Sequence, residues 1–238
     1  MPANAGIFHS NCTPNECDNM NQSAKKLNTA KASLEYIQDG MVLGVGTGST
    51  VNILIDLLPA FRNKIEAVVS SSVETKARLE QHSFKGSMLN QVGDVDLYID
   101  GADEATKHLH LIKGGGGALT REKVLAGAAH KFICIVDDSK LVSTLGTFPL
   151  PIEVIPMAQS FVARQLVKLH GQPIWREKFV TDNGNHILDI HNLTISNPPE
   201  METTLNQLPG VLTVGIFSHR PADILIIAND SGVRKIEQ

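Results

Sequence analysis

Four short segments of this 238-residue chain carry side chains and backbone groups that could do chemistry. They are "GTGST" at residues 46–50, "DGADE" at 100–104, "KGGGG" at 113–117 and "DDSK" at 137–140. Together they supply carboxylates, lysines, hydroxyls and the backbone amides of glycines. Such groups suit proton transfer and the binding of a phosphate.

The first segment has the composition of a glycine turn that opens a helix. It does not meet the dinucleotide fingerprint, because Ser49 stands where the third glycine is needed, and no Gly-Lys-Ser/Thr follows as in a P-loop. The hydroxyls of Thr47, Ser49 and Thr50 would lie beside free helix N–H groups, which suits a phosphate. A plain turn with an N-cap is the alternative that these residues leave open.

Asp100 and Asp103 are two carboxylates placed where an apolar run ends. Two carboxylates close together should raise the pKa of one of them, which favours proton transfer. Asp is also common in turns and caps, so that alternative stays open. Glu122 lies in the first turns of the helix expected after the glycines, but Arg121 is nearer the centre of its apolar stripe. Periodicity therefore leaves Glu122 equally compatible with a solvated helix position.

The four consecutive glycines 114–117 stand between Lys113 and the expected start of that helix. Glycine is entropically costly, so four in a row need a physical reason. Either the backbone adopts conformations closed to other residues, or a ligand approaches the backbone closely.

Strands that alternate with helices are expected to position these segments. We expect apolar strands at 41–46, 64–72, 95–104 and 132–138, and helices at 23–37, 51–61, 73–82 and 119–131. Such an alternation of apolar strands and helices indicates a parallel sheet covered on both faces. Ligands of open α/β sheets bind beyond the carboxyl ends of the strands. The four segments should therefore converge on one crevice.

The pattern changes near Pro149 to the order β-α-β-β-α-β, the ferredoxin-like arrangement. It includes a hairpin over 174–193 whose turn contains Asn183-Gly184-Asn185 and a single strand over 211–219. We predict an α/β chain with a Rossmann-like, mostly parallel sheet domain and a smaller ferredoxin-like α+β domain. The predicted divisions are a disordered tail at 1–22, the first domain at 23–148 and 222–238, and the second at 149–221.

The composition, 42% hydrophobic and 19% charged, is ordinary for a globular protein. A net charge of −4 without a basic patch argues against a nucleic-acid partner. No apolar stretch approaches the ~18 residues of a membrane helix. The three cysteines show neither zinc spacing nor a disulfide pattern, so we expect a location in the reducing cytoplasm.

Taken together, "GVGTGSTV", "DGADE", "KGGGGALTREK" and "FPLPIEVIPMA" resemble the ribose-5-phosphate isomerase A family. The resemblance runs from about residue 23 to the C-terminus. Four motifs in register carry it, whereas any one alone would be a weak signal. One departure is Gly117, where many relatives are expected to have alanine, and we expect this change to be conservative.

The resemblance implies an enzyme, a metal-independent isomerase without a cofactor. It would interconvert D-ribose 5-phosphate and D-ribulose 5-phosphate through a cis-enediolate, in the non-oxidative branch of the pentose phosphate pathway. Its partner would be a small-molecule sugar phosphate, and we expect a homodimer or homotetramer. The implied general base is Glu122, and the other implied catalytic residues are Asp100, Asp103 and Lys113. The implied substrate-binding residues are Lys26, Thr47, Gly48, Ser49, Thr50, Asp100, Gly101, Ala102, Asp103, Lys113, Gly114, Gly115, Gly116 and Lys140.

These residue types fit that chemistry. One carboxylate above the plane of a cis-enediol can reach both C1 and C2, and Lys113 with the glycine amides can stabilise the enediolate oxygen. Either Asp100 or Asp103 can move protons among hydroxyls and help to open the furanose ring.

Two other classes of function compete with this hypothesis. A non-catalytic sugar-phosphate sensor would need a DNA-binding segment, and residues 1–22 are neither basic nor helical enough. Acyl-CoA transfer on a similar fold would use a glutamate nucleophile, but it would not require the DGAD pair with Lys113.

Overall fold

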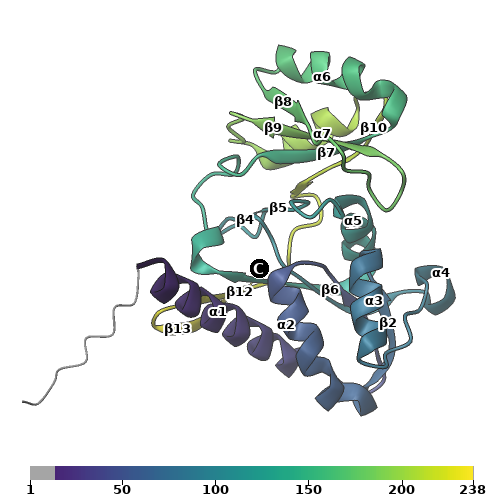
Figure 1. The fold of residues 1–238 in the computed structure, drawn as a ribbon, viewed down its shortest axis with the longest axis vertical. Helices are drawn as coiled ribbons and strands as arrows, with labels where there is room; N and C mark the ends of the chain where they lie inside the picture. The colour runs from purple at the N-terminus through teal and green to yellow at the C-terminus, as the bar shows by residue number, and fades with distance from the viewer. Residues whose placement is uncertain (1–13, 238) are drawn as a thin grey trace, which may run out of the picture.

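The larger part of the molecule is built on a six-stranded sheet with the order β13-β12-β6-β3-β1-β2. Figure 1 shows it below the second sheet, with β2, β6, β12 and β13 labelled. The computed structural model describes the backbone of residues 14–237 and the side chains of residues 22–237. All neighbouring strands are parallel except β13, which is antiparallel to β12. The expected mostly parallel sheet is thus confirmed. Its strands are β1 (Met41–Val45), β2 (Ile65–Ser70), β3 (Val95–Asp100), β6 (Ala129–Asp137), β12 (Ile224–Asn229) and β13 (Gly232–Glu237).

Side chains of the central strands are buried on both faces of the sheet, which explains their apolar sequences. In β3, for example, Leu97 and Ile99 belong to one core cluster and Tyr98 belongs to the other. Residues from α1 (Pro14–Ser33), α2 (Ser49–Leu57) and α3 (Val73–Gln81) join the first cluster, and residues from α5 (Leu119–Ala128) join the second. The remaining short helices here are α4 (Leu89–Val92), η1 (Leu34–Tyr36), η2 (Leu58–Lys64) and η3 (Asp138–Lys140).

The N-terminal helix is longer than the sequence pattern predicted. We expected a disordered tail over 1–22; residues 1–13 lie outside the described part, but the chain is helical from Pro14. Proline suits the first helical turn, because its fixed φ is already helical and its missing N–H would be unpaired there anyway. The helical backbone of residues 14–22 therefore differs from the disordered tail that the polar composition predicted.

Two further boundaries differ from the sequence prediction. The helix expected over 119–131 ends at Ala128, and the next residues already belong to β6. The strand expected over 211–219 is divided between two sheets, as β10 (Val211–Val214) and β11 (Ile216–Phe217). Gly215 lies at the division, where its N–H donates to the Pro151 carbonyl and its own carbonyl accepts from the Lys113 N–H. Through these two hydrogen bonds, Gly215 connects the backbone of Lys113 to strand β7 of the second sheet.

A second, antiparallel sheet has the order β10-β7-β9-β8 (Figure 1). It contains β7 (Leu150–Val154), β8 (Gln172–Trp175) and β9 (His186–His191), and it packs with α6 (Gln159–Lys168), which follows η4 (Pro156–Ala158), and α7 (Pro198–Asn206). The element order β7-α6-β8-β9-α7-β10 is the expected ferredoxin-like one. The predicted hairpin is present as β8 and β9, but ten residues, 176–185, connect its strands.

A third, small sheet has the order β11-β5-β4 and includes β4 (Glu104–Ala105) and β5 (Leu111–Ile112). These two strands lie between the larger sheets (Figure 1). The sheets divide the chain near the predicted positions 149 and 222, while the exact domain boundaries stay predictions. Within residues 14–237, no helix has the length and apolar character needed to cross a membrane.

Candidate active site

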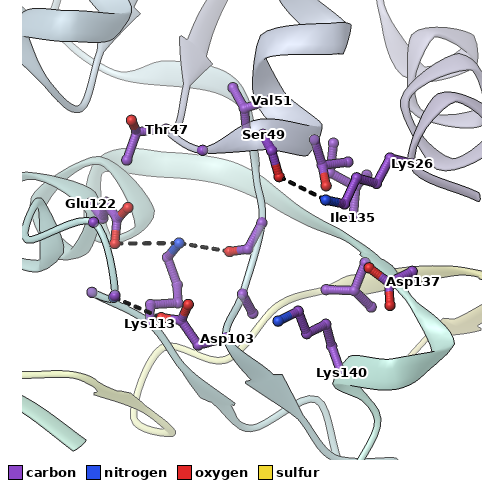
Figure 2. Close-up of a pocket in the computed structure, with 18 of the residues that line it drawn as sticks. Lys26, Thr47, Ser49, Val51, Asp103, Lys113, Glu122, Ile135, Asp137 and Lys140 are labelled. Carbon is purple, nitrogen blue, oxygen red and sulfur yellow. Dashed lines mark hydrogen bonds and ion pairs between the residues drawn. The ribbon is translucent and has the colours of Figure 1, made fainter. Parts of the chain in front are cut away.

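The carboxyl ends of β1, β3 and β6 open into one pocket, which the glycine loop 113–117 also lines (Figure 2). Parallel strands bring their carboxyl ends to the same edge of a sheet, so the four segments converge as the sequence predicted. The lining residues are Gln22, Lys26, Thr47, Gly48, Ser49, Thr50, Val51, Glu74, Gly101, Ala102, Asp103, Lys113, Gly114, Gly115, Gly116, Glu122, Ile135, Val136, Asp137 and Lys140.

Lys113 stands at the centre of the charged groups. Its Nζ lies 2.7 Å from Asp100 Oδ2 and 3.3 Å from Glu122 Oε2, and it donates to the Gly101 carbonyl at 2.7 Å. Burial works against the charge of Lys113, yet the combined attraction of Asp100 and Glu122 outweighs it and raises the pKa of the lysine. The site therefore holds a fixed positive charge.

Asp100 is completely buried and is not among the residues that line the pocket. Its Oδ2 accepts from Lys113 and from the Tyr98 hydroxyl, and its Oδ1 accepts from the N–H groups of Gly101 and Thr47. Four donors occupy the two oxygens of this carboxylate. Asp100 thus lies behind Lys113 and holds it in place. Tyr98 was missed at the sequence level, because an aromatic residue inside an apolar strand gives no signal of a polar role.

Asp103 lies in the pocket wall, where its Oδ2 accepts from the Gly115 N–H at 2.8 Å. Burial raises its pKa, and the negative charge of Asp100 adds to this effect. The expectation that one member of the pair would have a raised pKa is met at Asp103. Burial, rather than the neighbouring carboxylate, is the larger cause.

Glu122 projects from the first turns of α5 into the pocket, with its side chain 4% exposed (Figure 2). Its Oε2 is buried and accepts no hydrogen bond from the described residues, although Lys113 Nζ is near. Burial raises the pKa of Glu122, and the charges of Asp100 and Asp103 act in the same direction while Lys113 opposes them. This carboxylate is therefore a stronger base than an ordinary glutamate.

The side chains in the first turns of α5 do not point in the directions that the sequence periodicity predicted. Arg121, which the spacing placed nearer the apolar stripe, is 37% exposed in its side chain. The first residue of the helix, Leu119, is buried, and Glu122 lies three positions later on the same helix face, where it lines the pocket. The buried Leu125 and Ala126 continue this face.

The glycines at the two ends of the loop are required by backbone geometry. Gly114 has φ +104° and Gly117 has φ +82°, conformations that other residues adopt at a cost. A Cβ at Gly117 would also collide with the ring of Phe179. In this chain the backbone conformation of Gly117 and its contact with Phe179 therefore both disfavour alanine.

The two middle glycines, Gly115 and Gly116, are explained by the space that they leave in the pocket. A Cβ at Gly115 would lie 2.6 Å from Asp103 Oδ1, and one at Gly116 would have only Thr47 Cγ2 nearby, at 3.9 Å. Both residues line the pocket, and neither has a positive φ. The two reasons proposed for the glycines thus apply to different members of the loop.

The opposite end of the pocket is suited to an anion. Gly48 is the N-cap of α2, with φ +114°, and the hydroxyl residues around it line the pocket. Lys26 of α1 donates from Nζ to Ser49 Oγ at 3.0 Å, and Lys140 of η3 lines the same cavity from another wall (Figure 2). Two lysines and a helix N-terminus together favour a bound phosphate.

Several lining residues were not predicted from the sequence: Gln22, Val51, Glu74, Ile135, Val136 and Asp137. Only Asp137 had a signal, since it begins the segment "DDSK". Gln22 belongs to the stretch expected to be disordered. Within the described residues, no three His, Cys, Asp or Glu side chains are placed to hold a metal ion.

The fold and the site define an α/β enzyme whose pocket contains a buried carboxylate, a lysine held by two carboxylates, and a helix N-terminus suited to a phosphate. Residues 67–232 match the family described as ribose 5-phosphate isomerase A (phosphoriboisomerase A). The chain belongs to this family of isomerases.

Individual relatives cover nearly the whole chain. A ribose-5-phosphate isomerase A from Francisella tularensis subsp. novicida is 56% identical over 214 residues, which are 90% of this chain and 96% of the relative. The crystal structure of ribose 5-phosphate isomerase A from Neisseria gonorrhoeae has a TM-score of 0.89 at 42% identity, covering 91% of this chain and 97% of that one. A D-ribose-5-phosphate isomerase in complex with phospho-erythronic acid has a TM-score of 0.88 at 40% identity, covering 92% and 100%.

Proposed function

We propose that this protein interconverts D-ribose 5-phosphate and D-ribulose 5-phosphate through a cis-enediolate, in the non-oxidative branch of the pentose phosphate pathway. The observation that carries the proposal is the buried Oε2 of Glu122, which accepts no hydrogen bond from the described residues and is ion-paired with Lys113 at 3.3 Å. The relative solved with phospho-erythronic acid supports it, since that ligand, like the substrate, carries a phosphate on a polyhydroxylated carbon chain.

Glu122 is the proposed general base. In the direction of the ketose it takes the proton from C2 of the open-chain aldose and returns it to C1 on the same face. A carbon acid is weak, so a base with a raised pKa improves the proton transfer. Burial of the carboxylate supplies that rise without any additional group.

Lys113 is the proposed stabiliser of the enediolate oxygen. Its Nζ is fixed by Asp100 and the Gly101 carbonyl, so the positive charge needs no reorganisation when negative charge develops on the substrate. The glycines at 115 and 116 leave room for the sugar to approach this charge closely.

The two aspartates have different proposed roles. Asp103 lines the pocket with a raised pKa, so we assign it the movement of protons among the hydroxyls and the opening of the furanose ring. Asp100 has both oxygens occupied by donors and lies behind Lys113, so we assign it to positioning that lysine. The substrate's phosphate is assigned to the loop 47–50 with Lys26 and Lys140.

We also propose that the protein is a cytoplasmic homodimer or homotetramer with domains at 23–148 plus 222–238 and at 149–221. Exposed apolar side chains on the smaller domain support self-association, among them Met157, Phe161 and Trp175. Sedimentation of the purified protein would test the oligomeric state.

The test of the function is a direct assay. Purified protein is incubated with ribose 5-phosphate, and separately with unphosphorylated ribose, in the presence of excess chelator, and ketose formation is followed. We expect ketose from the phosphorylated sugar at a rate that the chelator leaves unchanged. Binding of ribose 5-phosphate without any ketose would favour a sensor, and loss of activity in chelator would contradict the metal-independent mechanism.

A further inference from the structure

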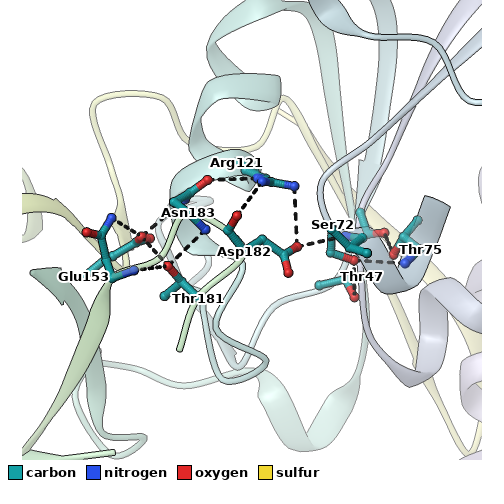
Figure 3. Close-up of polar contacts among 11 residues, drawn as sticks. Thr47, Ser72, Thr75, Arg121, Glu153, Thr181, Asp182 and Asn183 are labelled. Carbon is teal, nitrogen blue, oxygen red and sulfur yellow. Dashed lines mark hydrogen bonds and ion pairs between the residues drawn. The ribbon is translucent and has the colours of Figure 1, made fainter. Parts of the chain in front are cut away.

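The segment 176–185 connects β8 to β9, yet it leaves the smaller sheet and lies against the elements that carry the pocket (Figure 3). Its sequence "REKFVTDNGN" suggested only a hairpin turn. We call this segment the 176–185 loop. Its polar contacts connect the two ends of the pocket.

The loop is anchored on Glu153 of β7, which is completely buried. Glu153 Oε1 accepts from Thr181 Oγ1 at 2.7 Å, from Asn185 Nδ2 at 2.9 Å and from Asn183 Nδ2 at 3.2 Å. The Thr120 hydroxyl of α5 donates to the other oxygen, Oε2. A buried carboxylate with this many donors is well satisfied, so it holds its partners firmly. The loop and the first turn of α5 therefore share one anchor.

Arg121 ties the loop to α5 a second time. Its Nε donates to Asn183 Oδ1 at 2.9 Å, its Nη2 donates to the Asp182 carbonyl at 2.7 Å, and its Nη1 lies 3.5 Å from Asp182 Oδ2. Thr120 and Arg121 directly precede Glu122 in the chain. Both residues before the proposed base are thus bound to the same network.

Asp182 extends the network to the other side of the pocket (Figure 3). Its Oδ2 accepts from the N–H of Val73, the first residue of α3, at 2.8 Å. The preceding residue, Ser72, donates from its hydroxyl to Thr47 Oγ1 at 3.3 Å. Thr47 lines the pocket at the end assigned to the phosphate. One side chain of the smaller domain therefore lies between the base and the phosphate-binding loop.

We propose that Asp182 is a positioning residue for the isomerisation. By bridging α5 and the start of α3, it fixes the distance between Glu122 and the Thr47 loop, and so between the base and C1 and C2 of a substrate held by its phosphate. This inference rests on the proposed function. Displacements of about 1 Å at a catalytic group can cost up to ~10²-fold in rate, so such a bridge has a measurable effect.

The test compares three variants of the full chain: Asp182→Ala, Asp182→Asn and the control Glu177→Ala. Glu177 belongs to the same loop and is exposed, and its side chain makes no hydrogen bond or ion pair with the described residues. The control therefore also removes a carboxylate from the loop, but no contact with the first domain. For each variant we would measure kcat and KM for ribose 5-phosphate and the melting temperature.

We expect Asp182→Ala to lower kcat by roughly 10-fold or more with little change in KM, because the phosphate contacts remain while the base is misplaced. Asp182→Asn should stay within about threefold of wild type, since its amide oxygen still accepts from Val73 and an exposed ion pair with Arg121 adds little. Glu177→Ala should match wild type, and all variants should melt close to it.

A wild-type kcat in Asp182→Ala overturns the proposal. So does an equal loss in Glu177→Ala, or a loss in Asp182→Asn as large as in Asp182→Ala. If wild type itself forms no ketose, the proposed function fails, and the bridge is then judged by hydrogen exchange at the Val73 amide. Faster exchange of that amide in Asp182→Ala, and not in Asp182→Asn, supports the bridge, whereas unchanged exchange contradicts it.

Discussion

Glu122 Oε2 lies 3.3 Å from Lys113 Nζ, and the two side chains are 4% and 3% exposed. The distance would bring the proposed base and the proposed stabilising cation to the same small region of a substrate. The lysine already has Asp100 and the Gly101 carbonyl as closer partners. The glutamate is therefore left with a buried oxygen available for a proton.

This relationship predicts how activity depends on pH. Glu122 must be deprotonated to act as the base, and burial raises its pKa above the ordinary value of 4.5. The value of kcat/KM for ribose 5-phosphate should therefore rise with pH through a limb that lies above the ordinary pKa of a glutamate. A pH profile measures it, with Glu122→Gln expected to lack that limb. A limb at or below the ordinary value would contradict the assignment.

The same shift predicts a pH-dependent stability difference. Between the ordinary and the raised pKa of Glu122, the folded protein holds a proton that the unfolded chain has lost, so wild-type stability falls as pH rises through this range. Glu122→Gln cannot titrate there. Its free energy of unfolding relative to wild type should therefore increase with pH, as measured by urea denaturation between about pH 5 and pH 9.

The control for that measurement is Glu66→Gln, which changes an exposed carboxylate on β2. Its stability difference from wild type should stay flat over the same pH range. If the free energy of unfolding of Glu122→Gln relative to wild type stays flat or falls as the pH rises, burial does not raise the pKa of Glu122 and this prediction is wrong.

The lysines at the phosphate end predict a change in substrate preference. Lys140→Ala and Lys26→Ala should weaken binding of ribose 5-phosphate much more than binding of unphosphorylated ribose, by ~1.5–3 kcal/mol for a charge-assisted contact. Lys31→Ala, an exposed lysine of α1, is the matched control. Calorimetric titration with both sugars measures the difference. Equal losses for both would remove these lysines from the phosphate site.

Substitutions at two glycines of the loop should have different effects, one on activity and the other on stability. Gly116→Val should fold like wild type and lose activity, because its side chain would enter the pocket without a backbone penalty. Gly117→Ala should lose ~1–3 kcal/mol of stability from its positive φ, in addition to the collision with Phe179. Thermal melts and the ketose assay separate these effects. An active Gly116→Val would mean that the sugar does not occupy this part of the pocket.

The pocket was largely predictable because its residues follow simple local rules. Apolar strands that alternate with helices place their carboxyl ends together, so Thr47, Asp103 and Lys140 could be expected at one site from their positions after strands. The ferredoxin-like order was likewise visible from the sequence of elements.

The parts that were not predicted depend on contacts between residues far apart in the chain. The anchoring of the 176–185 loop depends on a pairing between Glu153 and residues about thirty positions later, which no local pattern indicates. Tyr98 lies inside an apolar strand, so no sequence pattern indicated that its hydroxyl donates a hydrogen bond to Asp100. Glu122 could not be distinguished from Arg121 by periodicity, because it shares the buried helix face of Leu119 and Leu125, where an apolar residue would be expected.

The central claim, that Glu122 is the base of an aldose–ketose isomerisation, is tested most directly by Glu122→Gln. The measurement is kcat for ketose formation from ribose 5-phosphate in excess chelator, together with the affinity for phospho-erythronic acid. We predict a loss of ~10²–10⁴-fold in kcat with binding and folding retained. A variant that binds normally and keeps more than about a tenth of wild-type turnover would contradict the account. Removal of a general base should cost much more than tenfold in rate.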